Sequence, residues 1–250
     1  MPLPKTIDEV VDRLEEILKV ELQSNRYTAL FTYIYMITTL AVKDGIDKQI
    51  FADNERMEDF DVRFANLYIQ AYEDYGVSNQ VSKSWQRAFD VGTNRLTIIQ
   101  HILLGMNAHI NLDLAVAAAE TCPGAEIFSL EADFQKINSI LFSLTKQPQR
   151  KIGRVSPMFF LLDNLITDAD EKIINFSMKQ ARSQSWRNAV LLAHADPLLQ
   201  PMLISEIDVA VAALAKRIEK PKSFFFRKTL QLVAKTEETN LKKILDRLYE

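Results

Sequence analysis

The stretch HILLGMNAHINLDL, residues 101–114, decides the fold of this chain. It is apolar around almost its whole helical circumference, yet it holds two of the chain's three histidines, two asparagines and one aspartate. A helix that is hydrophobic on all sides is normally buried. We therefore predict a central buried helix near residues 93–120, which the pair Pro123–Gly124 ends.

Apolar residues elsewhere in the chain recur at helical spacing, and few segments alternate as strands do. Thr6, with Glu9 three residues later, predicts the start of the first helix. The predicted helices cover about residues 7–22, 27–42, 55–75, 84–91, 93–120, 129–144, 157–165, 168–195, 197–218 and 224–249, with breaks at Asp44–Gly45 and Gly76, a cap at Ser129 and a basic loop over 147–157. This pattern predicts one all-α domain over residues 1–250, a bundle of about eight to ten helices with a charged C-terminal helix.

The composition, with 25% charged and 48% hydrophobic residues, is ordinary for a soluble globular protein. A formal net charge of -3 argues against a dedicated nucleic-acid binder, which usually has a basic excess. The single cysteine, Cys122, allows no internal disulfide and no Cys-rich zinc site. The first residues have no signal-peptide pattern, and the longest apolar run, residues 30–42, is too short for a transmembrane segment. We expect a cytoplasmic protein, and the oligomeric state stays open.

The polar residues of the central helix fall into two groups on a helical wheel. His109 and Asp113 are four residues apart and therefore neighbours on one face, with His101 about 80° from His109. Gly105 lies between the two histidines and leaves a gap that another backbone, a side chain or a ligand could enter. Asn107 and Asn111 are also four residues apart, on the far side.

This arrangement is costly for a helix. Polar residues and glycine lower helix propensity by a summed amount on the order of 3 kcal/mol over Gly105, Asn107, His109, Asn111 and Asp113. Buried polar groups must also find hydrogen-bond partners. Two explanations remain open at this point. Either the side chains form a packing network between helices, or they line a functional pocket.

In the pocket hypothesis, His109 is a catalytic acid or base, Asp113 orients it and His101 is its partner. A divalent metal (Zn, Fe or Mn) held by the same three residues is one version, and it would favour hydrolysis of an ester or phosphoester by an activated water. A metal-free pocket would favour an isomerase or cyclase acting on an apolar substrate. A small-molecule ligand is expected in both versions.

A second helix, FDVRFANLYIQAY at residues 60–72, also carries polar residues in an apolar pattern. Arg63 and Asn66 are three residues apart, so they could face the cluster together. The alternative is an ion pair, either of Arg63 at the rim or of a buried Asp61. Trp85 and Trp186 are predicted packing anchors, and either could instead floor an apolar pocket. His194 is predicted to cap a helix end rather than to supply a third metal ligand.

Several stretches, taken in order, resemble a bacterial family known as DUF5995. They are RYTALFTYIY (26–35), FADNERMEDFDVRFANLYIQAY (51–72), SWQRAF (84–89), HILLGMNAHINLDLAVAAAE (101–120), DFQKINSIL (133–141) and ARSQSWRNAVLLA (181–193). The resemblance covers about residues 25–195, and it implies a helical domain of unknown activity. It singles out the residues chosen by the helical wheel, with a predicted substrate-binding set of Arg63, Asn66, Tyr68, Asn107, Asn111 and Asn138 around His101, His109 and Asp113.

The sequence thus leads to two hypotheses of different classes. The first is a small-molecule-processing enzyme with a polar pocket inside a helical bundle. The second is a structural or interaction protein without catalysis, in which the same cluster only fixes helix packing.

Overall fold

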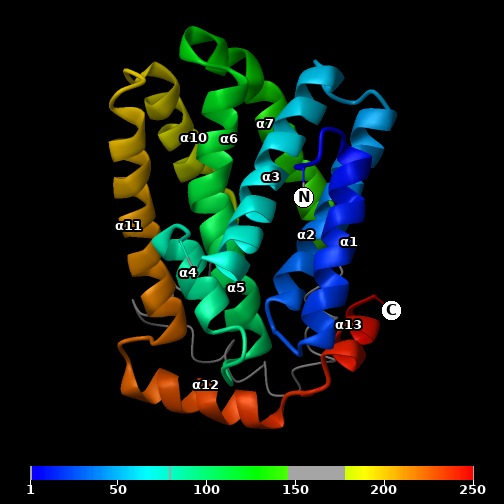
Figure 1. Cartoon of the computed structure of the whole chain (residues 1–250), viewed down its shortest axis with the longest axis vertical. Coiled ribbons are helices and arrows are strands. Elements are labelled where there is room, and N and C mark those ends of the chain that lie inside the picture. The colour runs from blue at the N-terminus through cyan, green and yellow to red at the C-terminus, as the bar shows by residue number, and fades with distance from the viewer. Residues whose placement is uncertain (1, 79, 146–177, 250) are drawn as a thin grey trace.

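The computed structural model describes residues 2–78, 80–145 and 178–249, and every regular element in these ranges is helical (Figure 1). The elements are α1 (Ile7–Gln23), α2 (Ala29–Asp47), α3 (Asn54–Val77), α4 (Lys83–Asp90), α5 (Ile98–Ala108), the π-helical turn η1 (His109–Asp113), α6 (Leu114–Thr121), the 3-10 turn η2 (Gly124–Glu126), α7 (Ile127–Thr145), α10 (Met178–His194), α11 (Gln200–Glu219), α12 (Phe224–Thr236) and α13 (Leu241–Tyr249). The predicted all-α bundle is confirmed. The helix predicted at 157–165, the loop over 147–157 and the start of the helix predicted at 168–195 lie outside the described residues.

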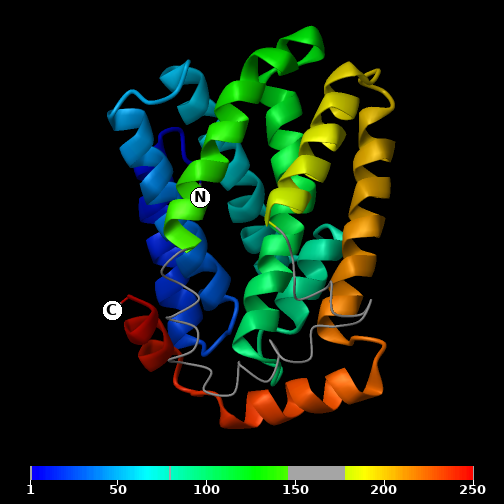
Figure 2. The same ribbon diagram turned by 180° about the vertical axis from the view of Figure 1, so that it is seen from behind.

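Most of the helices run along the long axis of the molecule, and α12 lies across one end (Figure 1, Figure 2). The run α5–η1–α6 passes through the middle of the bundle, with α2, α3, α4, α10 and α11 packed against it. This run is the central helix that the sequence predicts. In the described part of the chain, Ile98–Thr121 is the one helical run long and apolar enough to cross a membrane, but 83% of its most apolar window is buried inside the protein.

Side-chain caps set several helix starts, as the sequence pattern predicts for the first helix. The hydroxyl of Thr6 accepts a hydrogen bond from the backbone N–H of Glu9 at 3.3 Å. Thr97 and Gln100 form a full capping box at the start of α5, which satisfies backbone donors in both directions. The amide nitrogen of Gln100 also donates to the carbonyl of Ile218 at 2.7 Å and so ties the central helix to the end of α11.

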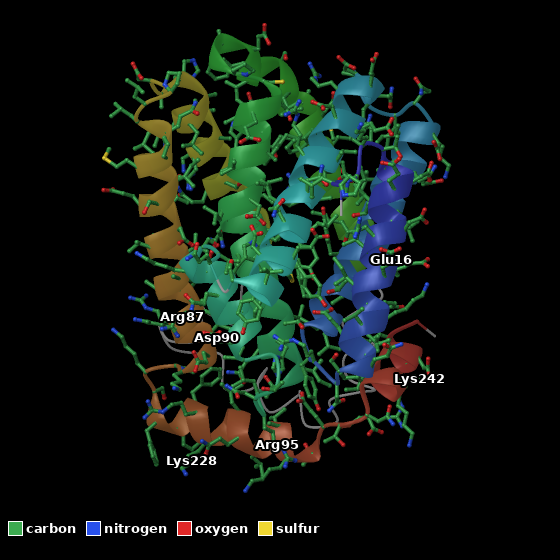
Figure 3. The ribbon with its side chains drawn as sticks, in the orientation of Figure 1. Glu16, Arg87, Asp90, Arg95, Lys228 and Lys242 are labelled. Atoms are coloured by element: carbon green, nitrogen blue, oxygen red, sulfur yellow. The ribbon has the colours of Figure 1, made fainter. Side chains whose placement is uncertain are left out.

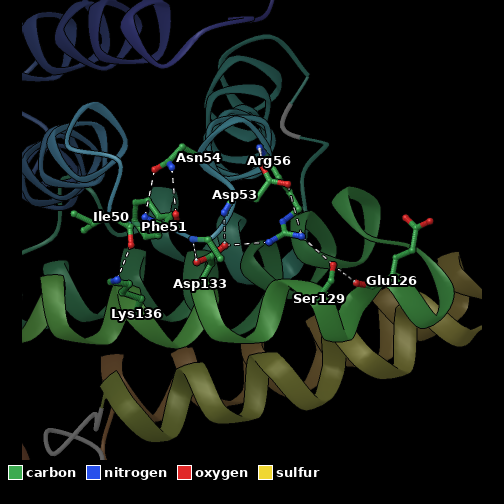
Figure 4. Close-up of polar contacts among 10 residues, drawn as sticks. Ile50, Phe51, Asp53, Asn54, Arg56, Glu126, Ser129, Asp133 and Lys136 are labelled. Carbon is green, nitrogen blue, oxygen red and sulfur yellow. Dashed lines mark hydrogen bonds and ion pairs between the residues drawn. The ribbon is translucent and has the colours of Figure 1, made fainter.

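Carboxylates from neighbouring helices cap further N-termini across the bundle. Asp133 of α7 accepts hydrogen bonds from the backbone of Ala52 at 2.7 Å and Asp53 at 3.2 Å, and from Arg56 at 3.0 Å (Figure 4). Asp208 of α11 accepts from the backbone N–H of Ser84 at 2.9 Å and from its hydroxyl at 2.6 Å. A negative charge at a helix N-terminus is favourable because it meets unpaired N–H groups and the positive end of the helix dipole. These contacts fix how α3 and α4 sit against α7 and α11.

The gap predicted at Gly105 is filled by Phe31 of α2. A Cβ atom built on Gly105 would lie 2.3 Å from Cγ of Phe31, well inside van der Waals contact. Phe31 is 4% exposed, and its ring also contacts the rings of Tyr68 and Trp85. Glycine therefore lets α2 pack directly against the central helix.

Four predicted boundaries are wrong. The central helix begins at Ile98 rather than near residue 93, because Thr97 caps it there. The other three differ for packing reasons. Helix α2 continues through Gly45 to Asp47, because burial of Ile46 outweighs the low helix propensity of one glycine. The predicted C-terminal helix is two helices, since Glu237 leaves the helical path and accepts a hydrogen bond from the backbone of Ile98 at 2.9 Å. Ser129 lies inside α7 and does not cap it; its hydroxyl donates to the carbonyl of Glu126 at 2.8 Å.

Candidate functional site

His109 and Asp113 open and close the π-helical turn η1. Nδ1 of His109 lies 3.0 Å from Oδ2 of Asp113, so the four-residue spacing does make them direct partners. The same carboxyl oxygen accepts a hydrogen bond from Nε1 of Trp85 at 2.9 Å. Short π-helical turns inside α-helices are rare and are frequent at functional sites.

Burial controls the protonation of this pair. Desolvation lowers the pKa of His109 well below its usual range, so the imidazole is neutral at neutral pH. Desolvation also raises the pKa of Asp113 well above its usual range, and the hydrogen bond from Trp85 opposes that rise. An indole nitrogen can only donate, so Oδ2 of Asp113 accepts from Trp85. We assign the contact with His109 as Nδ1–H donating to the same oxygen. Nε2 of His109 then carries a lone pair.

Aromatic rings hold the imidazole in place. Phe64 stacks on His109 with ring centroids 3.7 Å apart and planes 10° apart. Tyr35 meets the ring edge-to-face at 4.2 Å, and Phe31 does so at 5.6 Å. Nε2 of His109 is buried and has no hydrogen-bond partner among the described residues. A buried polar atom without a partner costs about 1–3 kcal/mol, so this nitrogen needs an explanation.

A cavity of about 70 Å³ lies beside His109. Its wall is mostly apolar and includes Phe31, Ile34, Phe60, Phe64, Met106 and Leu141. One water needs roughly 10–15 Å³ of such space, so the cavity has room for several waters or a small ligand group. The polar side chains in the wall are His109, Tyr35, Thr38, Asp61 and Arg182.

Asp61 and Tyr35 are two further cavity-lining side chains that each carry a buried polar atom. Asp61 is 6% exposed, and its Oδ2 atom has no hydrogen-bond partner in the described part of the chain. Desolvation, followed by the nearby charge of Glu58, raises the pKa of Asp61 to about 7. The Tyr35 hydroxyl is also buried, and no hydrogen-bond partner lies within 3.5 Å of it among the described residues. Desolvation raises the pKa of Tyr35, the charge of Asp61 adds to the rise, and the nearby Thr39 hydroxyl opposes it. Among the described residues, Asp61 does not form the buried ion pair that the sequence offered as an alternative.

Arg182 of α10 lines the cavity and is 4% exposed. Its Nε donates to Oδ1 of Asn138 at 2.7 Å, and one terminal nitrogen donates to the carbonyl of Phe134 at 2.6 Å. The guanidinium also lies 4.3 Å from the centroid of the Phe134 ring. Desolvation lowers the pKa of Arg182 to about 9, which leaves it charged at neutral pH.

A second buried acid lies behind the aromatic rings. Glu21 of α1 accepts a hydrogen bond from the Thr32 hydroxyl at 2.6 Å, and Thr32 lies 2.7 Å from the hydroxyl of Tyr68. Desolvation raises the pKa of Glu21 to about 7. Tyr68, predicted to bind substrate, is therefore engaged in this network rather than in the cavity wall. In contrast, charged residues such as Glu16 and Lys242 lie on the outside of the bundle (Figure 3).

The structure does not bring His101 to the His109–Asp113 pair. Its Nε2 lies 3.1 Å from the carbonyl of Asn94, and its ring stacks on Tyr27 with centroids 4.8 Å apart. Desolvation lowers the pKa of His101 to about 4. Phe31 occupies the space over Gly105 between the two histidines, which is why they do not meet.

The proposed metal ligands His101, His109 and Asp113 therefore do not converge. Within the described ranges, no group of three or more His, Cys, Asp or Glu side chains could hold a metal ion. His194 is likewise remote from the pair, with its Nδ1 2.9 Å from the carbonyl of Val190 near the end of α10.

The two asparagines of the central helix face the opposite side, as the helical wheel predicts. Asn107 is fully buried and donates to the carbonyl of Val211 in α11 at 3.0 Å. Asn111 donates to Oδ1 of Asn107 at 3.1 Å and lines a separate groove of about 420 Å³ beside α10 and α11. Neither residue lines the cavity beside His109.

The other predicted substrate-binding residues also lie outside the cavity wall. Arg63 is exposed and pairs with Asp59 at 2.8 Å, which is the rim ion pair considered from the sequence. Asn66 donates to the carbonyl of Pro4 at 2.9 Å and so holds the N-terminal segment. Asn138 acts on the cavity indirectly, as an acceptor for Arg182.

Sequence reasoning missed Tyr35 and Arg182, and it gave Asp61 a different role. For Arg182 a signal was available. It precedes Trp186 by four residues and Ala189 by seven, so it lies on the buried face of its helix. A charged residue on such a face indicates a partner or a ligand.

Residues 7–221 match the model of a family described as a family of unknown function, DUF5995. The match extends beyond the range of about 25–195 expected from the sequence. No curated protein and no solved structure matches the chain.

Proposed function

The chain belongs to the DUF5995 family, and we propose that it binds a small, mainly apolar molecule in the cavity beside His109 and exchanges a proton with it. His109 is the residue that touches the ligand, through Nε2. Asp113 is its positioning residue, and Trp85 holds Asp113.

One observation carries this proposal. Nε2 of His109 is buried, lacks a hydrogen-bond partner among the described residues, and belongs to a side chain that lines a cavity. Asp61 and Tyr35, whose side chains line the same cavity, each have a buried oxygen without a hydrogen-bond partner in the described part of the chain. A network that served packing alone would satisfy such atoms within the protein. Several unsatisfied atoms around one cavity support a ligand that completes them.

The arrangement supports metal-free acid–base chemistry. A neutral imidazole with a free lone pair on Nε2 can accept a hydrogen bond or a proton from a bound molecule. Proton transfer requires Asp113 in its carboxylate form, because a carboxylate stabilises the imidazolium that forms. The apolar wall favours a substrate with little charge near His109, as in an isomerase or cyclase. Metal-assisted hydrolysis is less well supported, because His101 does not join the pair as a third ligand.

The competing hypothesis, a purely structural cluster, is favoured by a different set of contacts. Asn107 links the central helix to α11, and Gly105 admits Phe31. These two positions serve packing, and they are separate from the cavity wall. The proposal therefore gives the central helix a packing side and a ligand side.

The test is a protein-detected NMR screen with ¹⁵N-histidine-labelled protein. The probes are straight-chain alcohols, ketones, amides and carboxylates of two to four carbons, which match a cavity of about 70 Å³. A ligand in the cavity should shift the His109 Nε2 resonance and leave His101 unchanged. The variant His109→Phe keeps an aromatic ring against Phe64 and should abolish binding, whereas His101→Phe, at a buried histidine outside the cavity wall, should bind normally.

Two results would overturn the proposal. One is that no probe shifts the His109 resonance in folded wild-type protein. The other is that His109→Phe binds the same probes with the same affinity. The packing hypothesis would then account for the cluster.

A further inference from the structure

Arg182 is the one lysine or arginine classed as buried among the described residues. Both of its hydrogen bonds go to neutral acceptors, the amide oxygen of Asn138 and the carbonyl of Phe134. No carboxylate of the described chain forms an ion pair with it. Burying a charge without a counter-charge is expensive, and such charges are normally paired.

Asp61 lines the same cavity but does not supply the missing counter-charge. Its pKa is raised by burial and by Glu58, and Arg182 is not among the groups that act on it. The two residues come from different helices, α3 and α10, and both line the cavity. The cavity wall thus holds one buried cation, Arg182, together with the neutral imidazole of His109 and the buried acid Asp61.

We propose that Arg182 is an anion-binding residue and that the molecule bound in the cavity is a short apolar compound carrying one carboxylate. This inference rests on the proposed function, because it names the class of ligand for the same site. The carboxylate would meet the guanidinium, and the apolar body would extend along the wall towards His109.

The geometry of Arg182 suits this role. A guanidinium has five N–H donors, and the two hydrogen bonds to Asn138 and Phe134 use one Nε and one terminal nitrogen. In the described part of the chain the remaining donors have no acceptor, and they can form the planar fork that a carboxylate matches. The Phe134 ring, 4.3 Å away, and the Asn138 amide hold the guanidinium in one orientation. Asn138 is therefore a positioning residue for the anion.

The experiment compares matched acid and amide pairs, propionate with propanamide and butyrate with butanamide, by NMR titration of wild-type protein at pH 7.5. A charge-assisted hydrogen bond to the carboxylate should make each acid bind about tenfold or more tightly than its amide. In Arg182→Gln this preference should fall to about onefold while the amide affinity changes little. The matched control is Arg187→Gln, which removes an exposed arginine of the same helix that bonds Gln184 and Ser183.

The outcomes separate this inference from the proposed function. If acid and amide bind equally at His109, the anion site is overturned and the apolar pocket stands. If no pair shifts His109, both are overturned. A preference that survives in folded Arg182→Gln also overturns the inference. Should that variant not fold, Arg182→Lys, which keeps the charge and loses the planar fork, should show a reduced preference, and an unchanged one would contradict the assignment.

Discussion

Trp85 donates its indole N–H to Oδ2 of Asp113 at 2.9 Å, on the oxygen that also faces His109. Trp85 is 2% exposed, so this hydrogen bond is made away from water. The contact joins α4 to the π-helical turn and keeps the carboxyl of Asp113 directed at Nδ1 of His109. The indole of Trp85 therefore links the aromatic rings around His109 directly to the polar pair of His109 and Asp113.

Replacing Trp85 with phenylalanine tests that link. Trp85→Phe keeps an aromatic ring but removes the donor, which should destabilise the protein by about 1–3 kcal/mol beyond the loss of ring area, as measured by urea unfolding. Trp186→Phe is the control, because Trp186 packs on Phe134 at 4.9 Å through its ring. If both variants lose the same free energy of unfolding, the hydrogen bond from Trp85 to Asp113 does not contribute to stability.

Two glycine-to-alanine substitutions should act in opposite directions. In Gly105→Ala the new methyl group would lie 2.3 Å from Phe31, and such overpacking should cost about 1–3 kcal/mol or more. In Gly76→Ala, within α3, no atom lies within 4 Å of the new Cβ, and the gain in helix propensity should stabilise the protein by up to about 1 kcal/mol. Thermal unfolding of both variants measures the difference. A harmless Gly105→Ala would contradict the close approach of α2.

The helices were largely predictable from the sequence because their signals are local. The spacing of apolar residues identifies the central run, and Thr6 identifies the start of α1. The boundaries that failed depend on residues far away in the chain. Glu237 ends a helix in order to cap Ile98, 139 residues away, and no local pattern announces that contact.

The candidate site was predictable only in part, for the same reason. The four-residue spacing of His109 and Asp113 within one helix predicts that their side chains are neighbours, and the structure has them in contact. Tyr35, Asp61 and Arg182 come from three other helices, and their convergence depends on packing. His101 was misjudged because a helical wheel places residues on a face but does not show that Phe31 would fill the gap between the histidines.

The buried acid Glu21 should make stability fall as the pH rises. Its pKa is raised from an ordinary value of 4.5 to about 7, mainly by desolvation. The folded state therefore binds this proton more tightly than the unfolded state. The free energy of unfolding is highest below pH 4.5, where Glu21 is protonated in both states, and it falls as the pH rises to about 7. Glu21→Gln, which stays neutral, should gain about 3 kcal/mol on wild type over this range.

Urea unfolding of Glu21→Gln and wild type at pH 4.5, 6 and 7.5 measures this gain. The control is Glu15→Gln, at an exposed glutamate of the same helix. The free energy of unfolding of each variant is compared with that of wild type at the same pH, because His101 also changes stability. Its pKa is lowered to about 4, so its contribution to stability rises with pH below pH 6.5. If the free energy of unfolding of both glutamine variants changes with pH in the same way, burial does not raise the pKa of Glu21.

Asn107 separates the packing side of the central helix from its ligand side. It is fully buried and bonds Val211 and Asn111, and it does not line the cavity. Asn107→Ala should therefore lower the free energy of unfolding by about 1–3 kcal/mol, because it removes a buried hydrogen bond to α11, while the affinity for a cavity ligand stays within about twofold. His109→Phe should show the reverse pattern, with binding lost in a folded protein. Urea unfolding and NMR titration of the two variants measure both quantities. Loss of binding in a fully stable Asn107→Ala variant would return this asparagine to the ligand-binding set predicted from the sequence.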